Sequence, residues 1–131
     1  MSVEFFEDKS GEQRWNVSDD GDIIHSCHEG FKRRNGALQN LFLNHAMMSV
    51  FVRGLAGSEK RASDDNARSR VQFDIGKDDK VWWKIYAVNG EPIGKSHMGF
   101  DSEAHSIDNL IMTYTMLSMY IAMHAQENNT E

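Results

Sequence analysis

Cysteine and proline are almost absent from this sequence. Its 131 residues include a single cysteine, Cys27, and a single proline, Pro92. One cysteine excludes a disulfide within the chain and is typical of a reducing compartment, so we expect a cytoplasmic protein. The scarcity of proline, with a hydrophobic fraction of 40%, predicts a folded globular chain rather than a disordered one.

Positive charge and long hydrophobic runs are also scarce. The chain has 14 basic and 20 acidic residues, which gives a formal net charge of -6. Because proteins that bind duplex DNA gain most of their affinity by neutralising phosphates, this balance argues against that function. The longest uncharged run, from Leu110 to Ala125, is shorter than the roughly 20 residues needed to span a bilayer. We therefore expect a buried helix there and no membrane association.

The sequence repeats itself with one gap. Up to the second turn, the matching pairs are Phe5 with Phe73, Lys9 with Lys77, Trp15 with Trp83, and Val17 with Ile85. After one extra residue, they are Gly21 with Gly90, Ile24 with Ile93, His28 with His97, Gly30-Phe31 with Gly99-Phe100, Asn40-Leu41 with Asn109-Leu110, Met47 with Met116, and Phe51 with Tyr120. Matching aromatic, glycine and apolar positions predict a tandem duplication.

Each copy predicts three strands followed by a helix. Runs of β-branched and aromatic residues, separated by turns rich in Asp, Asn and Gly, predict strands at 3–7, 13–18 and 22–27, and again at 70–75, 81–88 and 92–97. Apolar residues with a period of about 3.6 predict the helices. These stripes are Leu38, Leu41, Phe42, His45, Met48 and Val52, then Ile107, Leu110, Ile111, Tyr114, Leu117 and Ile121. We assign 1–57 to the first βββα repeat, 58–70 to a linker and 71–131 to the second repeat.

Several motifs of the second copy resemble a known family. They are the strand Trp82-Trp83-Lys84-Ile85-Tyr86-Ala87, the segment Asn89-Gly90-Glu91-Pro92-Ile93-Gly94-Lys95-Ser96, a Gly-Phe pair, and a helix with an Asn after small residues. This pattern resembles the YegP-like family of small bacterial and archaeal proteins, whose function is unknown. Members occur as tandem repeats or as dimers of single repeats.

The resemblance implies an α+β fold made of two tandem βββα repeats. A pseudo-two-fold axis would relate the repeats within one antiparallel sheet, with both helices packed on one face and the repeats forming a single compact domain. Family helices are short and lead into a strand exchanged between repeats. Here Leu41 and Leu110 predict helices that run on for several turns, and no strand-like segment follows the second helix. The resemblance supplies no catalytic or ligand residues.

Both predicted helices carry a second apolar face. Its residues are Met47, Phe51, Met112, Met116, Met119, Tyr120 and Met123. A helix that is apolar on nearly all sides must be buried on nearly all sides, and one sheet covers only one of them. The two helices can bury each other, or their ends can form an interface with another molecule. Because an exposed methionine patch favours aggregation, we favour a homodimer built through the long helices.

The tryptophan-bearing strands suggest a second surface. Trp15 and Trp83 occupy equivalent positions, which predicts a shared core beneath the helices. Trp82 and Lys84 would then point to the opposite face of the sheet. Together with Arg14, they are candidates for contact with single-stranded nucleic acid, although the net negative charge makes this the less favoured alternative.

Metal-ligating side chains are densest at His25-Ser26-Cys27-His28. Alternation along a strand places His25 and Cys27 on one face and His28 on the other, so we expect no metal site. The sequence contains no nucleophile motif, phosphate-binding loop or paired carboxylates, so we expect no enzymatic activity and no cofactor.

The leading interpretation is therefore a small cytoplasmic protein that acts by protein–protein contact as a homodimer. The alternative is an antagonist, encoded by a phage or mobile element, that blocks a host protein. The acidic stretch Asp19-Asp20-Gly21-Asp22 and the methionine face fit this alternative.

Overall fold

The strands and helices follow the turn and periodicity signals of the sequence. The computed structural model describes residues 2–57 and 70–129. In chain order its elements are β1 (Ser2–Glu7), β2 (Gln13–Asp19), β3 (Asp22–Cys27), α1 (Arg34–Gly57), β4 (Val71–Ile75), β5 (Val81–Tyr86), β6 (Pro92–Ser96) and α2 (Glu103–Asn129). Residues 58–69 of the predicted linker lie outside the described residues.

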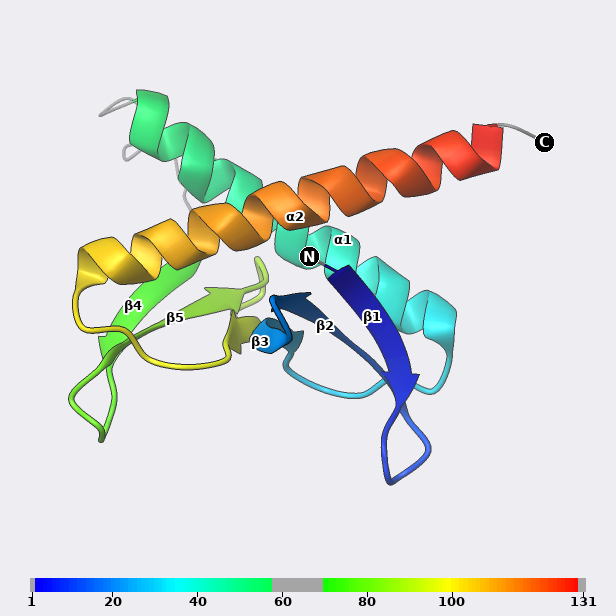
Figure 1. The fold of residues 1–131 in the computed structure, drawn as a ribbon, viewed down its shortest axis with the longest axis horizontal. Coiled ribbons are helices and arrows are strands. Elements are labelled where there is room, and N and C mark those ends of the chain that lie inside the picture. The colour runs from blue at the N-terminus through cyan, green and yellow to red at the C-terminus, as the bar shows by residue number, and fades with distance from the viewer. Residues whose placement is uncertain (1, 58–69, 130–131) are drawn as a thin grey trace.

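The six strands form one antiparallel sheet with the order β1-β2-β3-β6-β5-β4 (Figure 1). This confirms the α+β class. The fifth strand is shorter than predicted, because Ala87 already belongs to the next turn. Its N–H donates to the Glu91 carbonyl at 2.8 Å, and its own carbonyl accepts from Gly90 N–H at 2.9 Å. Gly90 has φ +89 there, a conformation in which glycine is favoured.

Both helices lie on the same side of the sheet and cross each other (Figure 1). Each helix begins over the three strands that precede it in the chain and then runs across the three strands of the other half. Thus Phe51 of α1 contacts Phe73 of β4 with ring centroids 5.5 Å apart. In α2, Tyr120 contacts Phe5 of β1 at 6.0 Å. Each helix therefore ties together strands from both halves of the chain.

The crossing point of the helices is partly polar. His45 of α1 stacks on Tyr114 of α2, with ring centroids 4.8 Å apart, and its Nε2 lies 2.8 Å from Ser118 Oγ. Burial lowers the pKa of His45. The two helices thus bury each other at this crossing, one of the two arrangements that the sequence left open.

The core beneath the helices contains both predicted tryptophans. Trp15 and Trp83 are completely buried. Their indole Nε1–H groups donate to Asn40 Oδ1 and Asn109 Oδ1, each at 2.9 Å. A buried indole N–H needs such a partner, and each bond contributes about 1 kcal/mol. These two asparagines therefore link each helix to the sheet.

His25 occupies the centre of the core. Its ring lies 5.1 Å from Trp15 in an edge arrangement and stacks on Trp83 at 4.7 Å. Nδ1 lies 2.5 Å from the carbonyl oxygen of Lys95, and because a carbonyl can only accept, Nδ1 carries the proton. Complete burial lowers the pKa of His25 to about 4, although its hydrogen bonds oppose that shift. The ring is therefore neutral at physiological pH.

Candidate binding surfaces

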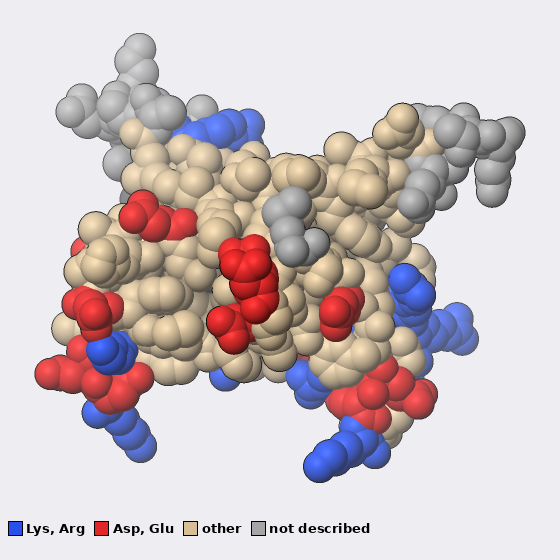
Figure 2. Space-filling model, viewed as in Figure 1, with Lys and Arg blue, Asp and Glu red and all other residues tan. Residues whose placement is uncertain are grey.

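Three methionine side chains are exposed along α2, which runs on past its crossing with α1 to β1 (Figure 1). Met112, Met119 and Met123 expose 37%, 46% and 60% of their surface. A hollow of about 200 Å³ lies between α2 and the start of β1. It is lined by Met116, Met119, Tyr120 and Met123 of the helix and by Ser2 and Val3 of the strand. Figure 2 shows that the part of α2 toward the C-terminus carries almost no charge, whereas charged side chains gather over the strands and hairpins.

The apolar residues predicted to form an interface differ in how deeply the structure buries them. Met116 is 4% exposed and belongs to the core, where it also lines the hollow beside β1. Met47, Phe51 and Tyr120 are half-buried and pack against the core. Met112, Met119 and Met123 remain on the surface, and they define what we call the methionine surface.

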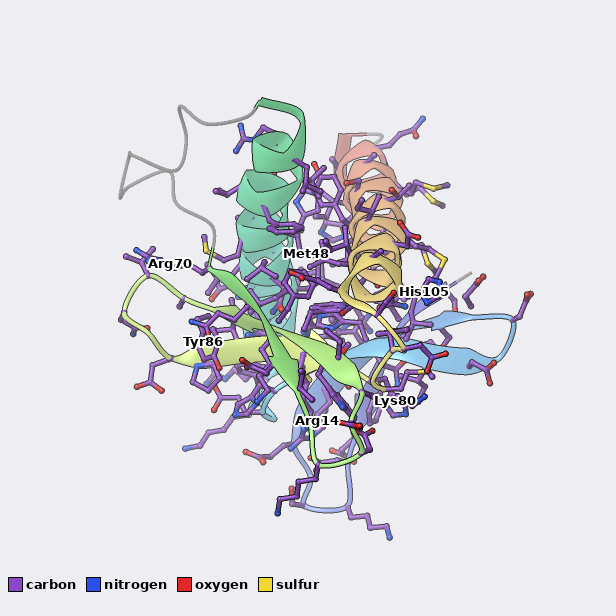
Figure 3. All side chains as sticks on the ribbon, turned by 90° about the vertical axis from the view of Figure 1, so that its left-hand side faces the viewer. Arg14, Met48, Arg70, Lys80, Tyr86 and His105 are labelled. Atoms are coloured by element: carbon purple, nitrogen blue, oxygen red, sulfur yellow. The ribbon has the colours of Figure 1, made fainter. Side chains whose placement is uncertain are left out.

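The face of the sheet opposite the helices forms the second candidate surface. Residues directly opposite each other in antiparallel strands point to the same side. One such row crosses all six strands and consists of Gln72, Lys84, Lys95, Ser26, Asn16 and Glu4. Because Trp83 and Trp15 face the helices, this row and the neighbouring Trp82 and Arg14 face away from them. Figure 3 places Arg14 on the side of the sheet opposite Met48, which lies toward the helices.

Trp82 borders a hollow of about 430 Å³ on this face. Lys84, Lys95 and Lys77 line the same hollow, as do Asp74 and Asp78. The Trp82 indole N–H donates to Asp78 Oδ1 at 3.2 Å. This bond is the main reason why the pKa of the Asp78 carboxyl falls below its ordinary value. The indole is thus held in place at the edge of an open, lysine-bearing hollow.

Two glycines accommodate the edge of the Trp82 ring. A Cβ at Gly76 would lie 2.8 Å from Trp82 Nε1, and a Cβ at Gly99 would lie 2.6 Å from the same atom. Side chains at either position would displace the indole or the backbone around it. Trp82 is therefore half-buried, and packing as well as its hydrogen bond fixes its orientation.

Lys84 and Lys95 are directly opposite each other on β5 and β6. Their cross-strand neighbours on either side, Gln72 and Ser26, are neutral. Within residues 2–57 and 70–129, neither lysine forms an ion pair. Like charges directly opposite each other destabilise an antiparallel pair, and among the described residues that border the same hollow only the carboxylates of Asp74 and Asp78 can offset part of that repulsion.

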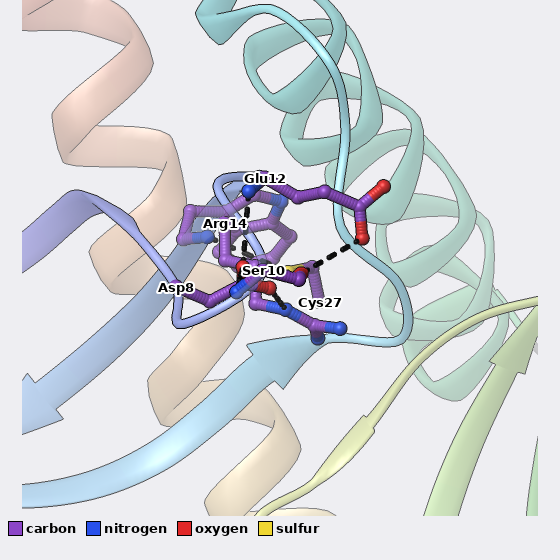
Figure 4. Close-up of polar contacts among 6 residues, drawn as sticks. Asp8, Ser10, Glu12, Arg14 and Cys27 are labelled. Carbon is purple, nitrogen blue, oxygen red and sulfur yellow. Dashed lines mark hydrogen bonds and ion pairs between the residues drawn. The ribbon is translucent and has the colours of Figure 1, made fainter.

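Arg14 lies in a separate part of the same face. Its Nε donates to Asp8 Oδ2 at 2.7 Å, and Asp8 also accepts from Ser10 and from the Glu12 N–H (Figure 4). The bonds from Ser10 and then Arg14 hold the pKa of Asp8 well below its ordinary range. β2 and β5 are three strand spacings apart, or roughly 14 Å. The structure thus brings Trp82 and Lys84 together but leaves Arg14 apart.

Lys95 was missed in the sequence because its position depends on sheet order. Alternation within β6 indicates only that Lys95 points away from Gly94 and Ser96. Its placement beside Lys84 follows from the pairing of β5 with β6. A two-residue hairpin at Asn89-Gly90 places Val88 opposite Glu91 and therefore Lys84 opposite Lys95, which is the pairing found in the structure despite the bulge between Ile85 and Tyr86. The hairpin signal could therefore have identified Lys95.

The cluster of metal-ligating residues in β3 is dispersed in the structure. Cys27 is buried and accepts the Trp15 N–H at 3.4 Å, and burial raises the pKa of its thiol. His25 is enclosed by the tryptophans, whereas His28 is exposed. In the described part of the chain, no three His, Cys, Asp or Glu residues are grouped so that they could hold a metal ion. Nor is either helix, over its described length, long and apolar enough to cross a membrane.

The fold defines an α+β protein whose six-stranded antiparallel sheet is covered on one face by two helices. Two solved structures share it. A UPF0339 protein from Shewanella oneidensis aligns with a TM-score of 0.63 and 15% identity, covering 88% of this chain and 82% of that chain. YegP from E. coli, a protein of unknown function, aligns with a TM-score of 0.62 and 11% identity, covering 88% and 84%.

These neighbours confirm the resemblance to YegP-like proteins at the level of the fold. No family model matches the sequence. No curated protein matches it significantly either.

Proposed function

We propose that this protein is a non-enzymatic homodimer that acts by protein–protein contact and is built from two tandem βββα repeats. The methionine surface of α2 carries the proposal. Large apolar side chains that are exposed together on one helix mark interaction sites more often than scattered ones do. Methionine is also common at such sites because its side chain adapts to the surface it meets.

Equivalent local features in the two halves support the tandem repeat. β2 and β5 each contain a bulge, at Val17/Ser18 and at Ile85/Tyr86. Isolated bridges join Gln13 to Phe31 and Val81 to Phe100. The Trp15–Asn40 bond has its counterpart in Trp83–Asn109. The pairs between β3 and β6 are centred on Ser26–Lys95, as a pseudo-two-fold axis through the middle of the sheet requires.

A second copy of this chain is the partner that the methionine surface fits best. The chain has a net charge of -6, so two copies repel each other wherever their acidic surfaces meet. No charged residue lies between Leu110 and Ala125, and α2 therefore offers an approach without that repulsion. A two-fold dimer also requires a self-complementary patch, and methionine packed against methionine meets that requirement.

Light scattering behind a sizing column tests the homodimer. We expect the mass of a dimer for the wild-type chain and of a monomer for Met119→Glu/Met123→Glu, because each substitution places a carboxylate in the interface. Both residues are exposed, so the variant should keep the wild-type melting temperature. Met98→Glu, compared with Met119→Glu alone so that each variant adds one carboxylate, is the control, since Met98 is 53% exposed but lies outside α2.

A monomeric wild-type chain at high concentration would contradict the homodimer. The methionine surface would then be open to a different protein, as an antagonist of a host protein requires. Equal loss of the dimer in Met98→Glu would also contradict the proposed interface, because it would show a general effect of added negative charge.

A further inference from the structure

We infer that the face of the sheet opposite the helices binds single-stranded nucleic acid around the hollow beside Trp82, with a base stacked on Trp82 and phosphates held by Lys84 and Lys95. This goes beyond the proposed homodimer, because it uses the opposite side of the molecule from the helices. The two surfaces are separate, so each can be tested without disturbing the other.

The lysine pair points to an anionic ligand. Lys84 and Lys95 lie directly opposite each other on adjacent strands, with neutral residues beside them in the row. Both border the open hollow beside Trp82. An anion that enters this hollow would relieve the repulsion between the two ammonium groups. A phosphate has the charge and the acceptor oxygens to contact both.

Trp82 points to a ligand with a planar group. Its indole is fixed by Asp78 and by contact with Gly76 and Gly99. A fixed aromatic ring loses little freedom when a base stacks on it, and such stacking tolerates any base because every base has an aromatic face. Proteins that bind single-stranded nucleic acid use this combination of an aromatic ring, on which a base stacks, and neighbouring cations, which contact the phosphates.

The far end of the face repeats this chemistry in a weaker form. Phe6 is 40% exposed and lies directly opposite Arg14. β1 is four strand spacings from β5, and along the strands Phe6 and Trp82 lie on opposite sides of the row that joins Glu4 to Lys84, so they are roughly 23 Å apart. An extended strand of several nucleotides can cover that distance, whereas a mononucleotide cannot.

The charges on this face also limit what it binds. Asp74 and Asp78 border the hollow, and Glu4 ends the row of residues across the sheet. With so few cations, the face suits a ligand that needs only two or three phosphate contacts. It does not suit a duplex, whose recognition depends on neutralising many phosphates. An acidic peptide would satisfy the lysines but would leave Trp82 without a planar partner.

Fluorescence anisotropy of a labelled oligo(dT) of about 15 nucleotides tests the inference on the full chain. Two phosphate contacts predict that affinity falls about sevenfold between about 50 and about 200 mM salt. Lys84→Gln/Lys95→Gln should lose at least about tenfold in affinity and most of the salt dependence. It should also melt at the same or a higher temperature, because the like-charge pair is gone.

Arg34→Gln/Arg53→Gln is the matched control. It removes the same charge, but both arginines lie on α1, on the other side of the sheet, so binding should change little. Trp82→Phe should weaken binding by less than Lys84→Gln/Lys95→Gln does, because a smaller aromatic ring remains for a base to stack on. Absence of binding at the low salt concentration would overturn the inference, and so would equal losses in the control and the lysine variant.

Two competitors distinguish the ligand classes. Thymidine monophosphate should compete poorly, because it engages only one end of the face, and complete displacement at oligonucleotide-like concentrations would indicate a mononucleotide site instead. A glutamate oligopeptide should not displace the labelled strand. Equal competition by that peptide would mean that the face binds anions without regard to an aromatic group, which contradicts the role given to Trp82.

Discussion

At the scale of single residues, Gly94 shows how one absent side chain lets the centre of the molecule pack. A Cβ at this position would lie 2.9 Å from His25 Cε1 and still closer to Asn44 Oδ1. Asn44 is held in place because its Nδ2 donates to the Asn40 carbonyl at 2.9 Å and to the Ile93 carbonyl at 3.0 Å. The space above Gly94 is therefore occupied by groups that have little freedom to move.

We expect Gly94→Ala to destabilise the protein by about 3 kcal/mol, the upper end of the usual penalty for overpacking. Urea unfolding followed by circular dichroism would measure this change. Gly90→Ala is a useful comparison, because Gly90 has φ +89 but no neighbouring atom within 4 Å of its Cβ position. Its penalty should come from backbone strain alone and should be smaller. Equal penalties at the two positions would contradict the packing explanation.

His25 makes the stability of the fold depend on pH. Burial lowers its pKa in the folded state to about 4, from 6.5 for the free side chain. The unfolded chain therefore binds a proton on His25 more readily than the folded chain does. The stability that neutral His25 contributes is fully present above pH 6.5 and is lost as the pH falls toward 4. We expect the free energy of unfolding to fall by about 2 kcal/mol between pH of about 7 and about 4.5.

Urea titrations across this pH range would test the role of His25, with His25→Gln as the variant. Burial also lowers the pKa of His45, so a smaller loss in the same direction should persist in the variant. Glutamine can donate to the Lys95 carbonyl but does not titrate. If the variant lost stability with pH as steeply as the wild-type chain, His25 would not be the source.

At the scale of elements, the sequence predicted where strands and helices occur better than how far their buried faces extend. Leu41, Met48, Leu110 and Leu117 are completely buried, as the apolar stripes predicted. Asn44, Ser106 and Thr113 are also buried on the same sides of the helices. Periodicity of apolar residues cannot reveal these positions, because a polar residue is buried only where a specific partner accepts it.

Polar burial on the helices follows from their partners. Thr113 Oγ1 donates to the Asn109 carbonyl one turn earlier, at 2.8 Å. Asn44 bonds both within α1 and to the backbone of β6. The matching of Asn40 with Asn109 was visible in the repeat, but the reason for it was not. The structure supplies that reason in the two indole N–H groups that these asparagines accept.

Met116 illustrates a second limit at this scale. The sequence placed it on the outer apolar face of its helix, yet its side chain is 4% exposed. The helical positions themselves were assigned correctly. What they do not reveal is that α2 runs on across the sheet to β1, where Tyr120 packs on Phe5 and buries this side of the helix as well. The candidate interface therefore narrows to Met112, Met119 and Met123.

The candidate site on the open face was predictable in part. Alternation correctly separated Trp82 and Lys84 from the buried Trp83. It did not separate Arg14 from them, since the sequence alone gives no strand order between β2 and β5. Distances across a sheet depend on which strands are adjacent, and the central pairing of β3 with β6 joins segments about seventy residues apart, beyond the reach of local patterns.

At the scale of the whole molecule, the crossed helices make the two halves depend on each other. Only three residue pairs join β3 to β6, so the sheet alone holds the halves together weakly. Phe51 of the first half packs against Phe73 of the second, and Tyr120 of the second half packs against Phe5 of the first. Their separation would expose the apolar surfaces of both helices and leave His25 without Trp83.

We expect a chain divided within residues 58–69 to assemble only when both halves are present. Co-expressed fragments 1–57 and 71–131, with an affinity tag on one of them, should purify in a 1:1 ratio and give a cooperative melting curve. Each fragment alone should be insoluble or give a poorly dispersed NMR spectrum, because the opposite half of its helix lacks a surface to pack on. Two copies of fragment 71–131 also lack His25, which would leave the space between the tryptophans unfilled. A well-dispersed spectrum for either isolated fragment as a monomer would contradict this dependence and would mean that each half folds as a domain of its own.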